Sequence, residues 1–309
     1  MKIFSGLLKL LIGVLFLIFI TLCFSFRSEI SSEKIKEKYC DAESKFAEVL
    51  GIPLHYKIEG KGDTLVLIHG TAASLHTWDD WTEILKDQFT IVRFDLPAFG
   101  VTGAAKNNSY TVQDYLNHVD GLLQQLSINK FHIAGNSLGG RIAWNYANSY
   151  PEKVKSLILL DASGYPIDKA PFVIKLAKTP ILNKIIKYCT PSFFIEKNLN
   201  EVYYKDDLIT DQLVERYYEL SRKEGNRQAF LDRVESIVEA RSKQIKDVRQ
   251  PTLVIWGEYD EWIPLECAHK FDQDIQDSEL KIIENSGHVP MEEDPETTAK
   301  IAADFILQH

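Results

Sequence analysis

Gly135-Asn136-Ser137-Leu138-Gly139 is the stretch of this chain that decides the fold. An apolar run at 131–134 precedes it and is typical of a short buried strand. Residues 138–150 follow with apolar side chains at helical spacing. A sharp turn between strand and helix would hold Ser137 clear of the sheet edge, and the glycines would relieve crowding there. A serine in that position can attack a carbonyl carbon.

A serine hydroxyl needs a base to activate it, and the base needs an acid to orient it. Residues 251–257 predict a strand, and Asp260 lies in the loop that follows. Residues 280–284 predict the next strand, and His288 comes shortly after it. The carboxyl ends of parallel strands meet at one edge of a sheet, where sites form. We therefore expect Ser137 as nucleophile, His288 as base and Asp260 as acid.

The chain resembles the α/β-hydrolase superfamily from about Phe46 to its C-terminus, and it is most similar to capped bacterial lipase- and esterase-type members. Its order of Ser, Asp and His is the order of that superfamily. One departure is Ala98, where relatives usually carry glycine. The segments that carry the resemblance are Leu67-Ile-His-Gly70, Asp95-Leu-Pro-Ala-Phe-Gly100, Gly135-Asn-Ser-Leu-Gly-Gly140, Gly257-Glu-Tyr-Asp-Glu-Trp-Ile-Pro264 and Gly287-His-Val-Pro-Met-Glu-Glu293.

The resemblance implies an oxyanion hole made of two backbone N–H groups. One belongs to Leu138, directly after the nucleophile. The other is expected from Thr71, with Ala72 as the neighbouring candidate. His69 would support this loop and would not be the base. Asp161 also follows a strand end and is the alternative acid.

The predicted fold class is α/β: an α/β-hydrolase fold with a mostly parallel sheet flanked by helices. Residues 46–162 and 249–309 are expected to form the catalytic domain. Strands are predicted at 54–58, 64–68, 90–94, 130–134 and 156–160, and helices at 78–86 and 111–126.

From 163 to 248 strand-like runs vanish, and helical patterns occupy 173–177, 181–186, 211–224 and 228–245. An all-helical insertion after the sixth strand is where the superfamily places its cap. We therefore expect a helical cap at 163–248.

The sequence of the N-terminal segment predicts an element separate from the catalytic domain. Residues 10–26 are almost wholly apolar and long enough, with 7–9, to cross a bilayer. The predicted transmembrane signal anchor spans 1–27, followed by a charged linker at 28–45. Cleavage or lipidation near Cys23 is the alternative, although the small residues that either would need are poorly placed. Lys2 and Lys9 favour a cytoplasmic N-terminus, whereas Arg27 opposes it; the two lysines predict a single-pass protein with its catalytic domain on the non-cytoplasmic side.

Charge and cysteine usage exclude several function classes. The formal net charge of -9 and the lack of a basic patch argue against nucleic acid as a partner. Cys23, Cys40, Cys189 and Cys267 are scattered without a metal-binding spacing. We expect no required disulfide, no metal and no cofactor.

The resulting hypothesis is a serine hydrolase that cleaves carboxylic esters through an acyl-enzyme, with an apolar small-molecule ester as substrate. The first alternative is a carbon–carbon bond hydrolase of the meta-cleavage type, which would need a cationic group for a substrate carboxylate. Further alternatives are a cofactor-free haloperoxidase-like activity and a non-catalytic hydrolase-fold binding protein. Dehalogenases and epoxide hydrolases use aspartate as nucleophile, which Ser137 disfavours.

Arg141 is expected to pair with a surface carboxylate. Aromatic residues could line the pocket or pack in the core: Trp256, Tyr259, Trp262, Phe193, Phe194, Tyr203 and Tyr204.

Overall fold

An eight-stranded sheet forms the centre of the molecule in the computed structural model, which describes residues 26–236 and 241–309. The strand order is β1-β2-β4-β3-β5-β6-β7-β8. The strands are β1 (Lys45–Val49), β2 (Ile52–Gly60), β3 (Asp63–Ile68), β4 (Phe89–Phe94), β5 (Phe131–Asn136), β6 (Val154–Leu160), β7 (Thr252–Gly257) and β8 (Ser278–Ile283).

The pairing of the strands is parallel from β4 through β3, β5, β6 and β7 to β8. β2 runs antiparallel to both β1 and β4. The central strands β5 and β7 are buried along their whole length, as expected when helices cover both faces of a parallel sheet. The carboxyl ends of β3, β5, β6, β7 and β8 therefore lie at one edge, and the residues that follow them gather there.

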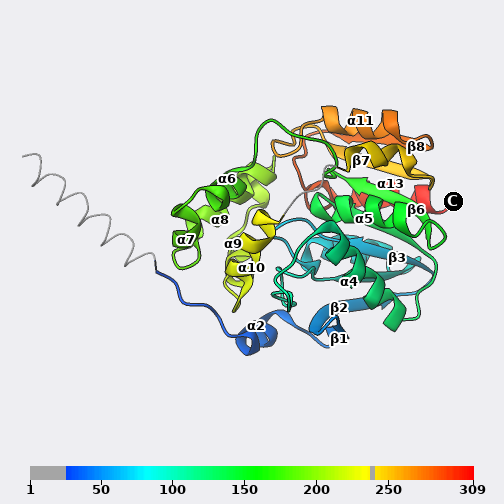
Figure 1. The fold of residues 1–309 in the computed structure, drawn as a ribbon. Helices are drawn as coiled ribbons and strands as arrows, with labels where there is room; N and C mark the ends of the chain where they lie inside the picture. The colour runs from blue at the N-terminus through cyan, green and yellow to red at the C-terminus, as the bar shows by residue number, and fades with distance from the viewer. Residues whose placement is uncertain (1–25, 237–240) are drawn as a thin grey trace, which may run out of the picture.

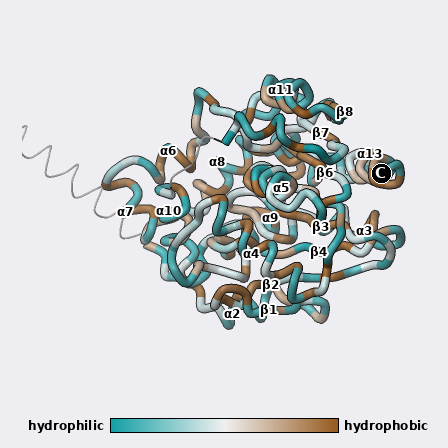
Figure 2. The backbone as a smooth tube through the Cα atoms, turned by 45° about the vertical axis from the view of Figure 1, so that its right-hand side comes forward, coloured by the Kyte–Doolittle hydropathy of each residue, from teal (hydrophilic) through white to brown (hydrophobic). Residues whose placement is uncertain are grey.

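Helices cover the sheet in two groups. α3 (Asp79–Leu85), α12 (Pro290–Glu293) and α13 (Pro295–Ile306) contact one another, and α4 (Val112–Gln125) contacts α5 (Leu138–Ser149). α11 (Glu266–Asp274) and the short η3 (Ser242–Asp247) extend the second group. Apolar and polar stretches alternate along these helices (Figure 2), as expected of helices that bury one face against a sheet.

A third group of helices lies between β6 and β7 in the chain and apart from the helices that flank the sheet (Figure 1). Its longest members have 11 residues, and several are shorter than the sequence predicts. In particular, the helix expected at 228–245 ends at Glu235. The group comprises α6 (Phe172–Lys178), α7 (Leu182–Ile186), α8 (Ser192–Val202), η2 (Asp206–Leu208), α9 (Asp211–Ser221) and α10 (Asn226–Glu235).

The segment before the sheet carries α2 (Ser32–Tyr39), which packs onto this third group. Ile35 is 1% exposed and clusters with Val101 and Leu220. Ile30 forms a parallel bridge with Lys223. The start of the described chain is thereby held against α9 and the loop that follows β4.

The expected membrane-spanning helix needs a correction. Except for Phe26, that stretch lies outside the described residues. Within 26–236 and 241–309, no helix is both long and apolar enough to cross a membrane. The longest described helix, α4, has 14 residues and carries Asp114 and Asp120, whereas a span needs about 20 apolar residues. The finding contradicts the transmembrane part of the predicted fold class and the predicted single-pass membrane localisation; the parallel sheet with its flanking helices is observed.

Candidate active site

Ser137 lies at the sharp turn between β5 and α5. Its backbone has φ 53° and ψ -112°, a conformation that L-residues rarely adopt. The flanking glycines make the turn possible, because a Cβ on Gly139 would lie 2.0 Å from the carbonyl oxygen of Ile68. A Cβ on Gly135 would lie 2.3 Å from the backbone of Gly139. The motif glycines thus let the turn pack against β3 with Ser137 at its apex.

His288 and Asp260 meet at the carboxyl ends of β8 and β7. His288 Nδ1 lies 2.7 Å from Asp260 Oδ2. The other carboxylate oxygen, Oδ1, accepts hydrogen bonds from the backbone N–H groups of Trp262 (2.7 Å) and Ile263 (3.0 Å). A carboxylate only accepts, so Nδ1 carries the proton and the neutral ring keeps Nε2 as an acceptor. Among the described residues His288 Nε2 has no hydrogen-bond partner, so it is available to a proton donor in the cavity.

Asp161 lies beside this pair but makes a different contact. Its Oδ1 accepts from Gly257 N at 3.0 Å. Burial raises the pKa of the fully buried Asp161 carboxyl well above its usual range, and the charge of Asp260 adds to this rise. Both influences favour the neutral, protonated form of Asp161.

Asp161, Asp260 and His288 have potential ligand atoms within 4.8 Å of one another, an arrangement that could hold a metal ion. The hydrogen bonds speak for another use, because His288 and two backbone N–H groups already satisfy the Asp260 carboxylate. A protonated Asp161 is also a poor cation ligand. The donor set therefore fits a hydrogen-bonded acid–base cluster better than a metal centre.

The loop after β3 brings Thr71 beside Ser137. His69 is fully buried, and its Nε2 accepts from Leu96 N at 2.9 Å while Nδ1 donates to Gly70 O at 2.7 Å. Burial lowers the pKa of His69, which keeps it neutral in this role. A Cβ on Gly70 would lie 3.2 Å from Ser137 Cβ, so the loop runs directly past the serine. Thr71 and Ser137 line the same cavity, and Leu138 begins α5.

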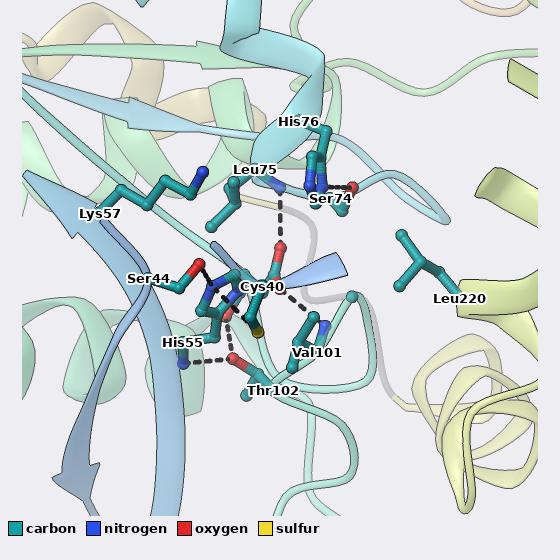
Figure 3. Close-up of polar contacts among 12 residues, drawn as sticks. Cys40, Ser44, His55, Lys57, Ser74, Leu75, His76, Val101, Thr102 and Leu220 are labelled. Carbon is teal, nitrogen blue, oxygen red and sulfur yellow. Dashed lines mark hydrogen bonds and ion pairs between the residues drawn. The ribbon is translucent and has the colours of Figure 1, made fainter. Parts of the chain in front are cut away.

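Asp95 also holds the loop after β3 in place. Its position in the Asp95-Leu-Pro motif could have indicated this role from the sequence. Its Oδ1 accepts from Leu75 N, and its Oδ2 accepts from Val101 N, both at 2.7 Å (Figure 3). His55 Nδ1 lies 2.8 Å from Oδ2, and His55 Nε2 lies 3.0 Å from Ser44 Oγ. The buried carboxylate thus joins the loops after β3 and β4 to strand β2.

Two further positioning residues hold His288 in place, and the sequence analysis missed both. Asn136 Nδ2 donates to the carbonyl of His288 at 2.9 Å. Glu293 Oε1 accepts from Gly287 N at 2.6 Å, and its Oε2 accepts from the N–H groups of Tyr204 (2.8 Å) and Lys205 (2.9 Å). Glu293 therefore connects the histidine loop to the chain that follows α8. Asn136 inside the serine motif and Glu293 shortly after His288 were the available signals.

Two adjoining cavities open onto Ser137. The inner cavity holds Ser137, His288, Thr71 and Trp262 in its wall. The outer cavity shares Ser137, Thr71 and Trp262 and has a volume of about 350 Å³, within the usual range of small-molecule sites. Its remaining wall comes largely from the segment between β6 and α6, with contributions from α6, α10 and the loop after β7, and includes Ile167, Ile174, Val234 and Ile263.

Basic side chains also line the outer cavity. Arg141 is part of its wall, together with Arg233 of α10 and Lys178 at the end of α6. A substrate held against Ser137 would therefore meet positive charge as well as apolar surface.

The aromatic residues divide between core, cavity and surface. Trp262 lines both cavities and lies 5.2 Å from the His288 ring, measured between centroids. Trp256 is fully buried, and its Nε1 donates to Ile263 O. Tyr259 stacks on Tyr204 with centroids 4.2 Å apart. The others lie elsewhere in the third helical group or beside it: Phe193, which is exposed, Phe194, which packs against it, and Tyr203, whose hydroxyl donates to Glu292.

Comparisons with known proteins identify the family. A family model described as alpha/beta hydrolase fold matches residues 63–295. The uncharacterized hydrolase YugF of Bacillus subtilis is 31% identical over 255 residues, which cover 82% of this chain and 92% of that protein. The chain therefore belongs to the α/β-hydrolase fold family, as its motifs indicate.

Two further relatives carry more specific names. A 2-hydroxy-6-oxo-2,4-heptadienoate hydrolase of Pseudomonas putida is 25% identical over 266 residues, which cover 83% of this chain and 93% of that protein. The solved structure of a membrane phospholipase A, described as a novel bacterial virulence factor, is 28% identical with a TM-score of 0.73. The match covers 99% of this chain and 98% of that chain. The family thus supports a hydrolase, and its members differ in the bond they cleave.

Proposed function

We propose that this α/β hydrolase cleaves carboxylic esters, with Ser137 as nucleophile, His288 as general base and Asp260 as the acid that orients it. The observation that carries the proposal is the His288–Asp260 hydrogen bond of 2.7 Å, which leaves His288 Nε2 without a partner among the described residues, in the cavity that Ser137 also lines. Hydrogen bonds between nucleophile and base are often long before substrate binds.

The reaction proceeds by acyl transfer to water. Ser137 Oγ attacks the ester carbonyl carbon while His288 Nε2 takes its proton, and the carbonyl oxygen becomes an oxyanion. The N–H groups of Leu138 and Thr71 hold that oxyanion, a contribution of about 10²- to 10³-fold in rate per donor. His288 then protonates the departing alcohol. A water molecule, deprotonated by His288, attacks the acyl-enzyme and releases the acid.

Asp260 acts through His288 and does not touch the substrate. Its Oδ2 holds the proton on Nδ1 and stabilises the imidazolium that forms when Nε2 accepts the serine proton. The two backbone N–H groups on Oδ1 hold the carboxylate fixed in direction. No step uses a cofactor.

The outer cavity favours a small-molecule ester with apolar portions. Its apolar wall, formed by side chains such as Ile167, Ile174 and Val234, would bury an acyl or alkyl group beside Ser137.

We also propose the domain organisation that the sequence predicts. Residues 46–162 and 249–309 would form the catalytic domain, and 163–248 would form a helical cap that closes the cavity.

A carbon–carbon bond hydrolase is the second candidate, and one observation favours it. Enzymes of that kind act on substrates with a carboxylate, and Arg233, Arg141 and Lys178 give the outer cavity cationic groups. The named dienoate hydrolase among the relatives supports the same alternative. The name phospholipase A of another relative is that of an ester hydrolase and supports the first.

One experiment separates the candidates. The protein is assayed against p-nitrophenyl esters of graded chain length and, as comparator, against a dienoic diketone acid. Ester hydrolysis that disappears in Ser137→Ala and persists in Ser149→Ala, an exposed serine, is the expected result. Cleavage of the diketone acid with no turnover of any ester would move the assignment to the second candidate. In that case Arg233→Gln should raise KM for the acid.

A further inference from the structure

A third cavity is lined in part by the loop after β3 and does not include Ser137 in its wall. Ala72 and Ala73 of that loop form one side, and Phe99 of the loop after β4 adjoins them. The surface of this cavity is almost wholly apolar. The apolar wall on the opposite side comes from the helices after β6: Val173, Ile186, Ile195, Leu220 and Phe230.

Arg227 places a positive charge in this apolar wall. The residue is only 5% exposed. Its Nε and Nη1 atoms are buried and have no hydrogen-bond partner within the described parts of the chain. A guanidinium is always charged in proteins, and a buried charge without a partner is costly. Two of the three guanidinium nitrogens are therefore open to an anion that the described residues do not supply.

The helix that carries Arg227 strengthens this argument. Arg227 lies in the first turn of α10, where the helix dipole disfavours a cation and favours an anion. The N-cap is Gly225, which has no side chain to accept from the first N–H groups. A buried cation and an uncapped helix start thus meet at one end of an apolar cavity.

Two charged side chains near Arg227 act on it through space in opposite directions. Glu29 attracts the guanidinium through space, while its Oε1 accepts a hydrogen bond from Gly225 N at 3.3 Å. Arg222 repels it. Burial is the largest influence and lowers the pKa of Arg227. A ligand that brings a negative charge would relieve this cost.

We propose that this cavity, named here the Arg227 pocket, binds the anion of a medium-chain fatty acid. The carboxylate accepts hydrogen bonds from the Arg227 guanidinium, and the alkyl chain lies along Leu220, Phe230 and Ile195. An inorganic anion would satisfy the charge but not the apolar wall. A neutral alcohol would fill the apolar wall but leave the guanidinium unpaired. Ser137 is not part of this pocket, although Ala73 lines both the pocket and the inner cavity that holds Ser137.

Isothermal titration calorimetry of the full-length protein tests the proposal with octanoate, octan-1-ol, octylammonium and sodium phosphate. Octanoate should bind at one site at least about tenfold more tightly than octan-1-ol, because a hydrogen-bonded buried charge gains more than a neutral hydroxyl. Octylammonium and phosphate should show no comparable binding. Equal affinity for octanoate and octan-1-ol, or phosphate binding as tightly as octanoate, would overturn the proposal.

Three variants locate the binding. Arg227→Gln should abolish the preference for octanoate over octan-1-ol, and Arg222→Gln, which removes the same charge outside the pocket, should preserve it. Ser137→Ala should bind octanoate as the unchanged protein does, whether or not the protein hydrolyses esters. Loss of octanoate binding in Ser137→Ala would place the acid in the Ser137 cavities and overturn the assignment. Removing an unpaired buried charge should not destabilise the fold, so the melting temperature of Arg227→Gln serves as the check on folding.

Discussion

The carboxyl groups of Asp161 and Asp260 lie within 4.8 Å of each other, and it is Asp260 Oδ2 that receives the hydrogen bond from His288 Nδ1. Both aspartates follow strand ends at the same edge of the sheet, so the sequence leaves either one as a candidate acid. The geometry favours Asp260. Asp161 instead accepts from Gly257 N at 3.0 Å, and burial together with the charge of Asp260 raises the pKa of its carboxyl.

This relationship predicts unequal effects of two matched substitutions. Asp260→Asn should lower kcat/KM for an ester by on the order of 10³- to 10⁴-fold, because the amide cannot fix Nδ1–H or stabilise the imidazolium. Asp161→Asn should change kcat/KM by less than about tenfold, since an amide replaces a neutral acid of the same shape. Steady-state kinetics of both variants decide the matter, and a larger loss in Asp161→Asn would transfer the role to Asp161.

The raised pKa of Asp161 also predicts the pH dependence of stability. The Asp161 carboxyl binds its proton more tightly in the folded state than in the unfolded state. Its contribution to the free energy of unfolding is therefore fully present below about pH 4 and is lost as the pH rises toward the folded-state pKa. Asp161→Asn removes that loss. Its free energy of unfolding should therefore exceed that of the unchanged protein by more at about pH 7 than at about pH 5 in urea titrations. A gain independent of pH would mean that Asp161 is ionised in the folded state.

His55 predicts a second pH effect, which arises away from the triad. Burial lowers the pKa of His55, but the hydrogen bond and the charge of Asp95 outweigh it and raise the pKa to about 9. The Ser44 hydroxyl donates to Asp41, so it accepts from His55 Nε2, and both ring nitrogens carry protons. The buried ion pair ties the loop that follows β4 to strand β2.

The stability that this pair contributes should be complete below about pH 6.5 and should be lost as the pH rises through about 9. The loss should amount to a few kcal/mol at most, by the relation of about 1.4 kcal/mol per pKa unit. His55→Gln should be less stable at neutral pH and should flatten the decline between about pH 7 and pH 9. Urea unfolding across that range is the measurement, and an unchanged slope in His55→Gln would refute the ion pair.

The features with strong local signals could be predicted from the sequence. The strands from β2 to β8 follow apolar runs, and their observed bounds differ by a few residues at most from those expected. β1 was not predicted, because Lys45–Val49 is a short edge strand that buries only two side chains. The α8 helix was also missed. Pro191 precedes it, and its paired Phe193 and Phe194 gave no clear periodic signal.

Some residues of the candidate site could likewise be predicted from the sequence, and others could not. Ser137, His288 and Asp260 lie beside recognisable strand ends, so the chain order suffices to propose them. Asn136 and Glu293 act through contacts between segments distant in the sequence, which no local pattern reveals. The positions of Arg227 and Arg233 in the cavity walls depend on how the helices after β6 pack together, so the charges of both cavities became visible only in three dimensions.

Glu293 offers a test of how His288 is positioned. Its carboxylate accepts N–H groups from Gly287 on one side and from Tyr204 and Lys205 on the other. Glu293→Gln would turn an amide N–H toward one of these donors and displace the histidine loop. We expect kcat to fall by about 10- to 100-fold with a smaller change in KM, as is typical of a misplaced catalytic group. Glu296→Gln, an exposed neighbour, is the control and should behave as the unchanged protein does.

The residue at position 139 of the serine motif must be glycine because there is no room for a side chain. A Cβ at this position would lie 2.0 Å from Ile68 O and 2.7 Å from His69 O, and neither backbone atom can move without shifting the loop that carries Thr71. Gly139→Ala should therefore destabilise the protein by roughly 1–3 kcal/mol or more and reduce ester hydrolysis in the fraction that folds.

Gly121→Ala is the matched control, since its Cβ would meet one side-chain atom of Val49 and lies within α4. Thermal unfolding and kcat/KM are measured for both variants. If Gly139→Ala unfolds at the same temperature as the unchanged protein and retains its activity, the close approach of β3 and the serine turn does not determine the geometry of the site.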